Sequence, residues 1–166
     1  MNLNLGLTQM IIKEAQSKGL LRNQLAYVLA TAYHESGHTM QPVKEAYWLS
    51  EDWRKKNLRY YPWYGRGLVQ ITWSYNYQLA KDKLGVDFIK DPNLVMVPEN
   101  AVKILITGMV EGWFTKKKLS DYIDLKHSDF VDARKIINGT DKASLIASYA
   151  VEYDKDLTKL GYGVTK

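Results

Sequence analysis

The stretch NQLAYVLATAYHESGH, residues 23–38, decides how we expect this chain to fold. Its apolar residues at the spacing i, i+3, i+4 and i+7 are Leu25, Val28, Leu29 and Ala32. This spacing is typical of a helix that buries one face, and Asn23 is a suitable residue to cap its start. Glu35 follows three residues after the last of them, so the buried face ends in a carboxyl group.

Helical patterns on both sides of this stretch predict a mainly α protein. The expected helices run from Thr8 as N-cap to Gly19, from Ser74 to Leu84, from Pro98 to Gly112, from Asp129 to Ile137, and from a cap at Thr140 or Asp141 through Leu157. Segment 87–98 is predicted as a loop. The helix after Pro98 is apolar on a broad face and should lie deep in the core, and its Gly108 and Gly112 indicate close helix approach.

The middle of the chain lacks a helical period and is rich in aromatic residues. From Gly37 to Tyr64 this composition predicts an irregular segment that forms the wall of a cleft. Gly65 to Thr72 is then predicted as an extended stretch, in which period two places Gln70 and Thr72 on one side and apolar residues on the other. One side can pack on the core while the other faces a ligand.

Length and composition favour one soluble globular domain over residues 1–166. The chain has 46% hydrophobic and 25% charged residues. It has no apolar run near the roughly 18 residues that span a bilayer, and its N-terminus lacks the pattern of a signal peptide. The absence of cysteine excludes disulfides and a thiolate nucleophile. The net charge of +5 favours association with polyanions, such as the acidic polymers of a bacterial wall.

Glu35 is the leading candidate for acid–base chemistry. Burial at an apolar helix face and proximity to the negative end of the helix dipole both disfavour ionisation of a carboxyl group, which suits a general acid. The alternative interpretation is a glutamate at a fraying helix end, or one that pairs with a nearby arginine.

Glycoside cleavage also needs a second carboxylate. Glu45, Glu51 and Asp52 are the candidates in the loop that follows Glu35. Glu45 comes ten residues after Glu35, which is enough chain to fold back across a cleft. Glu51 and Asp52 lie among basic residues, where pairing with Arg54 or Lys55 is the simpler interpretation.

A metal-dependent peptidase is the sharpest rival interpretation. His34, Glu35 and His38 match the HExxH pattern, in which two histidines on one helix face bind zinc and the glutamate acts as base. Gly37 stands where that helix should continue, and a third ligand is hard to name, although Glu45, Glu51 and Glu111 remain open.

Four segments together resemble the family 19 glycoside hydrolases, the chitinase-like group that includes many bacteriophage endolysins. In chain order they are AYHESGH at 32–38, YYPWYGRGLVQITWSYNY at 60–77, LGVDFIKDPNLV at 84–95 and ARKIINGT at 133–140. The second resembles the YYGRGPIQLS and NYN motifs of the family, and the last resembles its IINGG turn. The compact size, the lack of cysteine and segment 38–62 are more similar to phage endolysins than to plant chitinases.

The resemblance implies an α-rich, lysozyme-like fold with a cleft, and an inverting mechanism without a metal or other cofactor. By the matched motifs, Glu35 is the general acid and Gln70 and Thr72 are the polar pair beside the nucleophilic water. Asn76 and Asn138 match substrate-binding asparagines. The matched motif also contains Tyr64 and Arg66, and we count both with Trp48 among the expected substrate-binding residues.

The second carboxylate does not align cleanly with the family, and we favour Glu45 as general base with Glu51 second. The first functional hypothesis is a muramidase-type phage endolysin that cleaves β-1,4 bonds of peptidoglycan after release through the inner membrane by a holin-type partner. The second is a chitinase, the third the zinc peptidase, and the fourth a carbohydrate- or nucleic-acid-binding module without activity. For the endolysin we expect a monomer that binds the polysaccharide, with no nucleic-acid partner and no stable membrane association.

Overall fold

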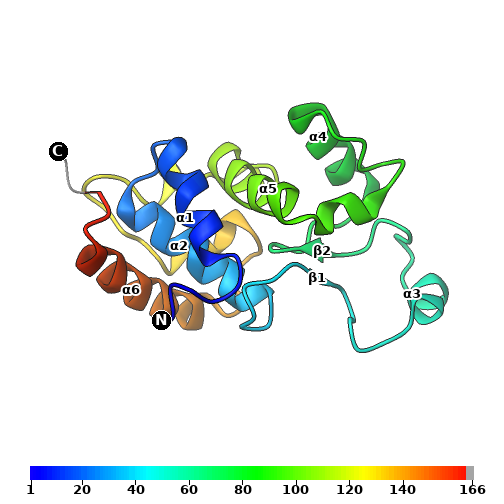
Figure 1. The fold of residues 1–166 in the computed structure, drawn as a ribbon, viewed down its shortest axis with the longest axis horizontal. Coiled ribbons are helices and arrows are strands. Elements are labelled where there is room, and N and C mark those ends of the chain that lie inside the picture. Colours follow the sequence, from blue (N-terminus) through cyan, green and yellow to red (C-terminus); the bar gives the residue numbers. More distant parts are fainter. Residues whose placement is uncertain (164–166) are drawn as a thin grey trace.

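The computed structural model describes residues 1–163 and is mainly helical, as the sequence predicts. Four long helices build the core: α1 (Thr8–Ser17), α2 (Arg22–Glu35), α5 (Pro98–Glu111) and α6 (Ala143–Leu160). Helix α2 packs along α6 and also contacts α1 and α5, so it lies at the centre of this group (Figure 1). The residues of α2 predicted to face the core, including Leu25 and Ala32, are fully buried.

The two strands and two further helices extend the molecule away from this core. Strand β1 (Val43–Lys44) pairs antiparallel with β2 (Arg66–Gly67). Helices α3 (Glu51–Asn57) and α4 (Ser74–Leu84) lie at the end of the molecule opposite α6, with the two strands between (Figure 1). Three short 3₁₀ helices complete the described chain: η1 (Pro92–Met96), η2 (Leu119–Asp121) and η3 (Asp132–Ile136).

Three predicted helix caps are wrong, and for the first two the polar side chain bonds elsewhere. Helix α1 follows Leu7, while the Thr8 hydroxyl donates to the carbonyl of Leu5. Helix α2 begins one residue before Asn23, whose side-chain amide instead reaches the segment around Ser128. Helix α6 starts after Lys142, beyond both predicted caps, Thr140 and Asp141.

Three segments differ from their predicted secondary structure. The segment predicted to be irregular contains α3, whose start is capped by the Ser50 hydroxyl. The predicted loop at 87–98 contains η1, because the Asp91 carboxylate accepts a hydrogen bond from the next turn. The expected helix at 129–137 is only the 3₁₀ helix η3, since the Asp129 carboxylate accepts from the Asp132 N–H and starts a tight turn there.

Gly108 and Gly112 allow the segment that follows α5 to turn and pack against the helix. Gly112 adopts a φ of 76° and ends α5. A side chain at Gly108 would collide with the ring of Phe114, so this glycine makes room for Phe114. The close approach predicted between helices is therefore an approach of the next segment onto α5, and it places Phe114 at the wall of the pocket described below.

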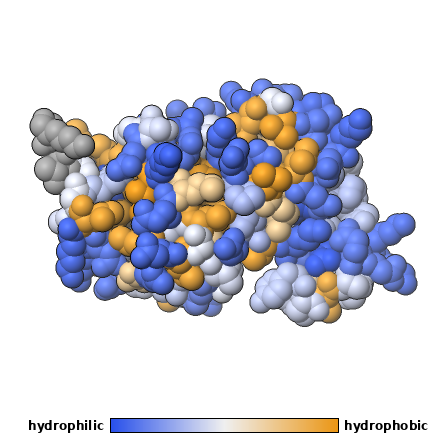
Figure 2. Space-filling view, in the orientation of Figure 1, coloured by the Kyte–Doolittle hydropathy of each residue, from blue (hydrophilic) through white to orange (hydrophobic). Residues whose placement is uncertain are grey.

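The face of the molecule seen in Figure 2 carries many hydrophilic residues, with apolar patches between them. A groove of about 630 Å³ lies between α1 and α5 and is lined by Met10, Val102 and polar or charged residues. It does not contain any of the sequence-predicted catalytic residues. None of the helices in residues 1–163 is both long enough and apolar enough to cross a membrane.

Candidate active site

A smaller pocket, of about 230 Å³, opens at the C-terminal end of α2. It gathers Glu35, the loop that follows β2, the start of α4 and the segment after η3. Its lining residues are Glu35, Val69, Gln70, Ile71, Thr72, Asn76, Phe114, Ile137 and Asn138. Five of the nine predicted site residues therefore lie together, although they come from segments up to 103 positions apart.

Glu35 is the last residue of α2, and its side chain is 18% exposed. Arg134 of η3 donates from Nη1 to Oε1 of Glu35 at 3.0 Å. The arginine is only 3% exposed, and its Nε also donates to the carbonyl of Asp141. Arg134 thus holds one oxygen of the Glu35 carboxyl group, and the pocket leaves that group accessible to a ligand. The sequence indicated a partner arginine only as an alternative, and it did not identify Arg134.

Loss of the Arg134 guanidinium should destabilise the protein strongly. Replacing one member of a buried ion pair leaves the other charge uncompensated, which costs about 3 kcal/mol. For a protein of this size, Arg134→Met should therefore lower the melting temperature by roughly 6–12 °C. Thermal unfolding followed by circular dichroism measures this shift.

Arg22→Met is the matched control, because Arg22 pairs with Asp154 on the surface. Its guanidinium side chain is 40% exposed, and such pairs contribute about 1 kcal/mol or less. Equal losses of stability in the two variants would contradict a special role for the buried pair.

The loop after β2 presents Gln70 and Thr72 to the pocket by a turn. Gln70 has a φ of 56°, so the predicted extended stretch is interrupted there, and Arg66 bridges Ile71 across the turn. The Gln70 amide N–H₂ donates to the carbonyls of Val43 and Gly67, which fixes the loop on the strand pair. Gln70 and Thr72 both line the pocket, but so do Val69 and Ile71, so the predicted division into two sides does not hold through this left-handed turn.

The Thr72 hydroxyl is oriented to accept a hydrogen bond. It donates its proton to the carbonyl of Gln70 at 2.9 Å, which leaves oxygen lone pairs for a further donor. The Asn76 amide donates to the carbonyl of Thr72 at 2.8 Å, so the first turn of α4 fixes the same segment. Asn138 also lines the pocket; it is exposed and lies two residues after the end of η3. These groups can bind the hydroxyl and amide groups of a sugar.

Glu45 lies next to Gln70. A side chain added to Gly65 would meet Gln70 Oε1 at 2.7 Å and Glu45 Oε1 at 3.2 Å, so both groups lie against this glycine. Glu45 Oε1 accepts from the Gly65 N–H at 2.9 Å, and Oε2 accepts from the Tyr60 hydroxyl at 2.5 Å. Burial and the Glu45 carboxylate raise the pKa of Tyr60 to about 12, so this hydroxyl remains a donor. A carboxylate has about four acceptor positions, and Glu45 uses two of them.

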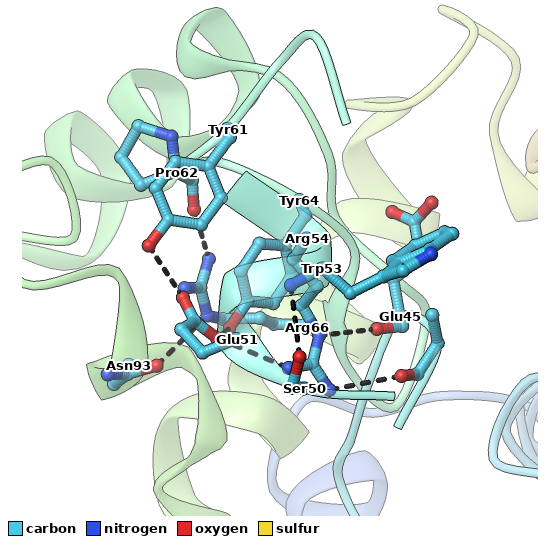
Figure 3. Close-up of polar contacts among 11 residues, drawn as sticks. Glu45, Ser50, Glu51, Trp53, Arg54, Tyr61, Pro62, Tyr64, Arg66 and Asn93 are labelled. Atoms are coloured by element: carbon cyan, nitrogen blue, oxygen red, sulfur yellow. Dashed lines mark hydrogen bonds and ion pairs between the residues drawn. The ribbon is translucent and has the colours of Figure 1, made fainter. Parts of the chain in front are cut away.

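Glu51, the second choice for the base, is more fully occupied by the protein. Its carboxylate accepts from the hydroxyls of Tyr61 and Tyr64 and from Arg54 (Figure 3). Arg54 also donates to the carbonyls of Glu45 and Ala46, which ties α3 to the preceding loop. The predicted pairing of Glu51 with Arg54 is confirmed, and this geometry gives Glu51 a supporting role.

Glu51 should make stability depend on pH in the acid range. Burial raises the pKa of its carboxyl group, but hydrogen bonds from Tyr61 and Tyr64 and the charges of Lys44 and Arg54 outweigh it and hold the pKa below its ordinary value of 4.5. Because the folded-state pKa is the lower one, the stabilisation is complete above the unfolded-state value and is lost as the pH falls through the folded one. We expect Glu51→Gln to flatten the decline of melting temperature between about pH 5 and pH 3.

Asp52→Asn provides the control for this measurement. Asp52 pairs with Lys56 at 3.0 Å, and both side chains are about 70% exposed, so the pair should contribute little. The acid decline in this variant should match that of the wild type. If the melting temperature of Glu51→Gln declined with falling pH as steeply as that of the wild type, other carboxyl groups would determine the loss of stability in acid.

Three predicted substrate-binding residues do not line the pocket. Tyr64 is fully buried and Arg66 is 2% exposed, with the guanidinium 3.7 Å from the centre of the Tyr64 ring. Arg66 also donates to Asn93, which holds η1 on β2 (Figure 3). Burial does not fit a direct sugar contact for either residue, and we interpret both as supports of the loop. Trp48 is 71% exposed and stands outside the pocket, in edge contact with Tyr47.

The HExxH pattern does not form the geometry of a zinc peptidase. Helix α2 ends at Glu35, and both Gly37 and His38 have positive φ, so the two histidines do not share a helix face. The His38 ring stacks on Tyr33 at 4.4 Å, and burial lowers the pKa of His34. Within residues 1–163, no three His, Asp or Glu side chains come together as ligands for a metal ion.

Comparisons with known proteins identify the family. The model of chitinase class I, Glyco_hydro_19, matches residues 26–121, more than half of the chain. Chitinase 11 of rice is 33% identical over 124 residues, which cover 61% of this chain and 48% of that protein. Chitinase 5 of rice is 36% identical over 80 residues, which cover 45% and 27%, and basic endochitinase CHB4 of Brassica napus is 30% identical over 104 residues, which cover 59% and 37%.

The chain thus spans about half or less of the length of these curated relatives. A crystal structure of a chitinase C mutant is 18% identical, with a TM-score of 0.40 and coverage of 76% of this chain and 73% of that one. The matched range includes Glu35, Glu45, Gln70, Thr72 and Asn76, whereas Arg134 and Asn138 lie beyond it. By the family match, which bears out the sequence resemblance, this chain belongs to the chitinase class I family, family 19 of the glycoside hydrolases.

Proposed function

We propose that this chain hydrolyses β-1,4 glycosidic bonds of cell-wall peptidoglycan with Glu35 as general acid and Glu45 as general base. The observation that carries this proposal is the pocket itself, in which Glu35 faces Gln70, Thr72 and Asn76. The carboxyl group supports acid catalysis, the amide and hydroxyl groups support sugar binding, and Glu45, outside the pocket lining but beside Gln70, is the second carboxylate that glycoside cleavage needs.

Each group has a defined part in the reaction. Glu35 donates its proton to the glycosidic oxygen as the bond to the anomeric carbon breaks. Glu45 takes a proton from a water molecule that attacks this carbon from the opposite face, which inverts its configuration. The Thr72 oxygen accepts the second hydrogen of that water, and Gln70 Oε1, beside Glu45, helps to orient it. Arg134 keeps the Glu35 side chain in place throughout.

The choice of peptidoglycan rests on charge and on the sequence resemblance to phage endolysins. A net charge of +5 attracts the chain to an anionic wall, and an electrostatic contribution to encounter is lost at high salt. An endolysin would act after a partner protein opens the inner membrane, and we propose that it acts as a monomer. A chitinase of the same mechanism is the second candidate, because the curated relatives are named as plant chitinases.

Digestion of purified substrates tests the proposal. The protein is incubated with Gram-negative peptidoglycan and, separately, with chitin oligomers, each with and without a chelator, and products are read by mass and by reducing ends. New reducing sugar ends from peptidoglycan that persist with chelator support the proposal. Cleavage of chitin alone favours the second candidate. Release of peptides, or loss of activity with the chelator, would instead support the zinc peptidase.

A further inference from the structure

A second pocket lies beside Glu45 and is not used by the proposed chemistry. It has a volume of about 210 Å³ and lies between the segment after α3 and the start of α4. Its lining residues are Arg59, Tyr60, Tyr61, Trp63, Trp73 and Ser74. Two links join it to the Glu35 pocket: Trp73 follows Thr72 directly, and Tyr60 donates to Glu45. The two pockets are thus lined by consecutive residues, Thr72 and Trp73, and a glycan that spans this step would reach both.

Arg59 is the cation that lines this pocket. The chain has five arginines, and four of them hold carboxylate or carbonyl groups: Arg22, Arg54, Arg66 and Arg134. Across residues 1–163, the guanidinium of Arg59 has no such partner, and the side chain is exposed. It lies over the ring of Trp73, 5.4 Å from the ring centre. Its donors remain available to a ligand, while the stacking keeps the group near the pocket.

The aromatic walls of the pocket are held by the two glutamates. The Tyr60 hydroxyl donates to Glu45, and the Tyr61 hydroxyl donates to Glu51 at 2.8 Å (Figure 3). The Tyr60 and Trp73 rings contact each other with centres 4.9 Å apart. The pocket thus combines flat apolar surface with the guanidinium of Arg59, which suits a sugar ring that carries a carboxylate.

We propose that Arg59 and Trp73 form a subsite for a carboxylate-bearing sugar, and that this subsite selects acidic glycan strands over neutral ones. The proposal rests on the proposed glycosidase function and specifies its substrate. The muramic acid residues of peptidoglycan carry a lactyl carboxylate, or a peptide linked through it that has its own carboxylates. Chitin has none, so only the acidic strand gains a charge-assisted hydrogen bond from Arg59.

The test compares Arg59→Gln with the wild type on peptidoglycan and on chitin oligomers. The loss of one charge-assisted hydrogen bond should lower kcat/KM on peptidoglycan about tenfold, and on chitin oligomers by a factor of about three or less. Lys55→Gln is the matched control, because it removes one exposed positive charge from the neighbouring helix α3. It should behave like the wild type on both substrates.

Equal losses on both substrates, no loss on either, or an equal loss in Lys55→Gln would overturn the subsite. If the wild type does not cleave peptidoglycan, the proposed function fails, and a binding experiment then tests the subsite independently. In that case Glu35→Gln protein, with and without Arg59→Gln, is titrated with a muramic-acid-containing disaccharide and with chitobiose. Tighter binding of the acidic sugar that depends on Arg59 supports the subsite, and equal binding of the two sugars refutes it.

Discussion

Glu35→Gln should reduce turnover at least about a thousandfold, because the amide cannot donate a proton to the leaving oxygen. The amide oxygen can still accept from Arg134 Nη1, so the side chain should keep its position in the pocket. Reducing-end assays on the substrate that the wild type cleaves measure the loss. Substrate binding by the inactive variant should remain close to that of the wild type.

Glu35→Gln should also reduce the stability of the fold. The substitution removes the counter-charge of a nearly buried arginine. We therefore expect a stability loss of about 1–3 kcal/mol, which is small enough for a protein of ordinary stability to remain folded. Near-normal activity in a folded Glu35→Gln protein would remove Glu35 from the reaction.

The parts of the site that lie close together in the sequence could be predicted from it. The apolar spacing in α2 placed Glu35 at the end of a buried face, because a helix fixes the direction of each side chain by its position. The contact of Glu35 with Arg134 joins residues 99 positions apart, and no local pattern specifies such a pair. Segment ARKIINGT contained the only signal, since it places Arg134 four residues before the asparagine that was singled out.

Tyr64 and Arg66 show a different limit of predicting residue roles from sequence. A motif match indicates that residues matter to a fold or site, but it does not separate a buried support from an exposed contact. Here the arginine stacks on the tyrosine inside the protein and donates to the Pro62 carbonyl. The sequence also did not reveal the left-handed turn at Gln70, because its alternation of polar and apolar residues fits an extended strand equally well.

Glu45→Gln should lower kcat about a hundredfold or more, whereas Glu51→Gln should lower it by less than about tenfold. Glu45 lies beside Gln70 and keeps acceptor positions for a water molecule, while three donors occupy the carboxylate of Glu51. The two variants are matched, because each replaces a carboxylate that accepts a tyrosine hydroxyl. Single-turnover and steady-state rates on the same substrate separate a chemical defect from weaker binding.

The pH dependence of these two variants distinguishes a base from a structural carboxylate. If Glu45 activates the water, Glu45→Gln should lose the acid limb of the pH–rate profile, and added azide, which needs no general base, should restore part of the rate. Glu51→Gln should keep the wild-type pH–rate profile, and added azide should not change its rate. The reverse pattern would assign the base to Glu51, and the hydrogen bonds of Glu45 to Tyr60 and Gly65 would then serve only to position the wall of the cleft.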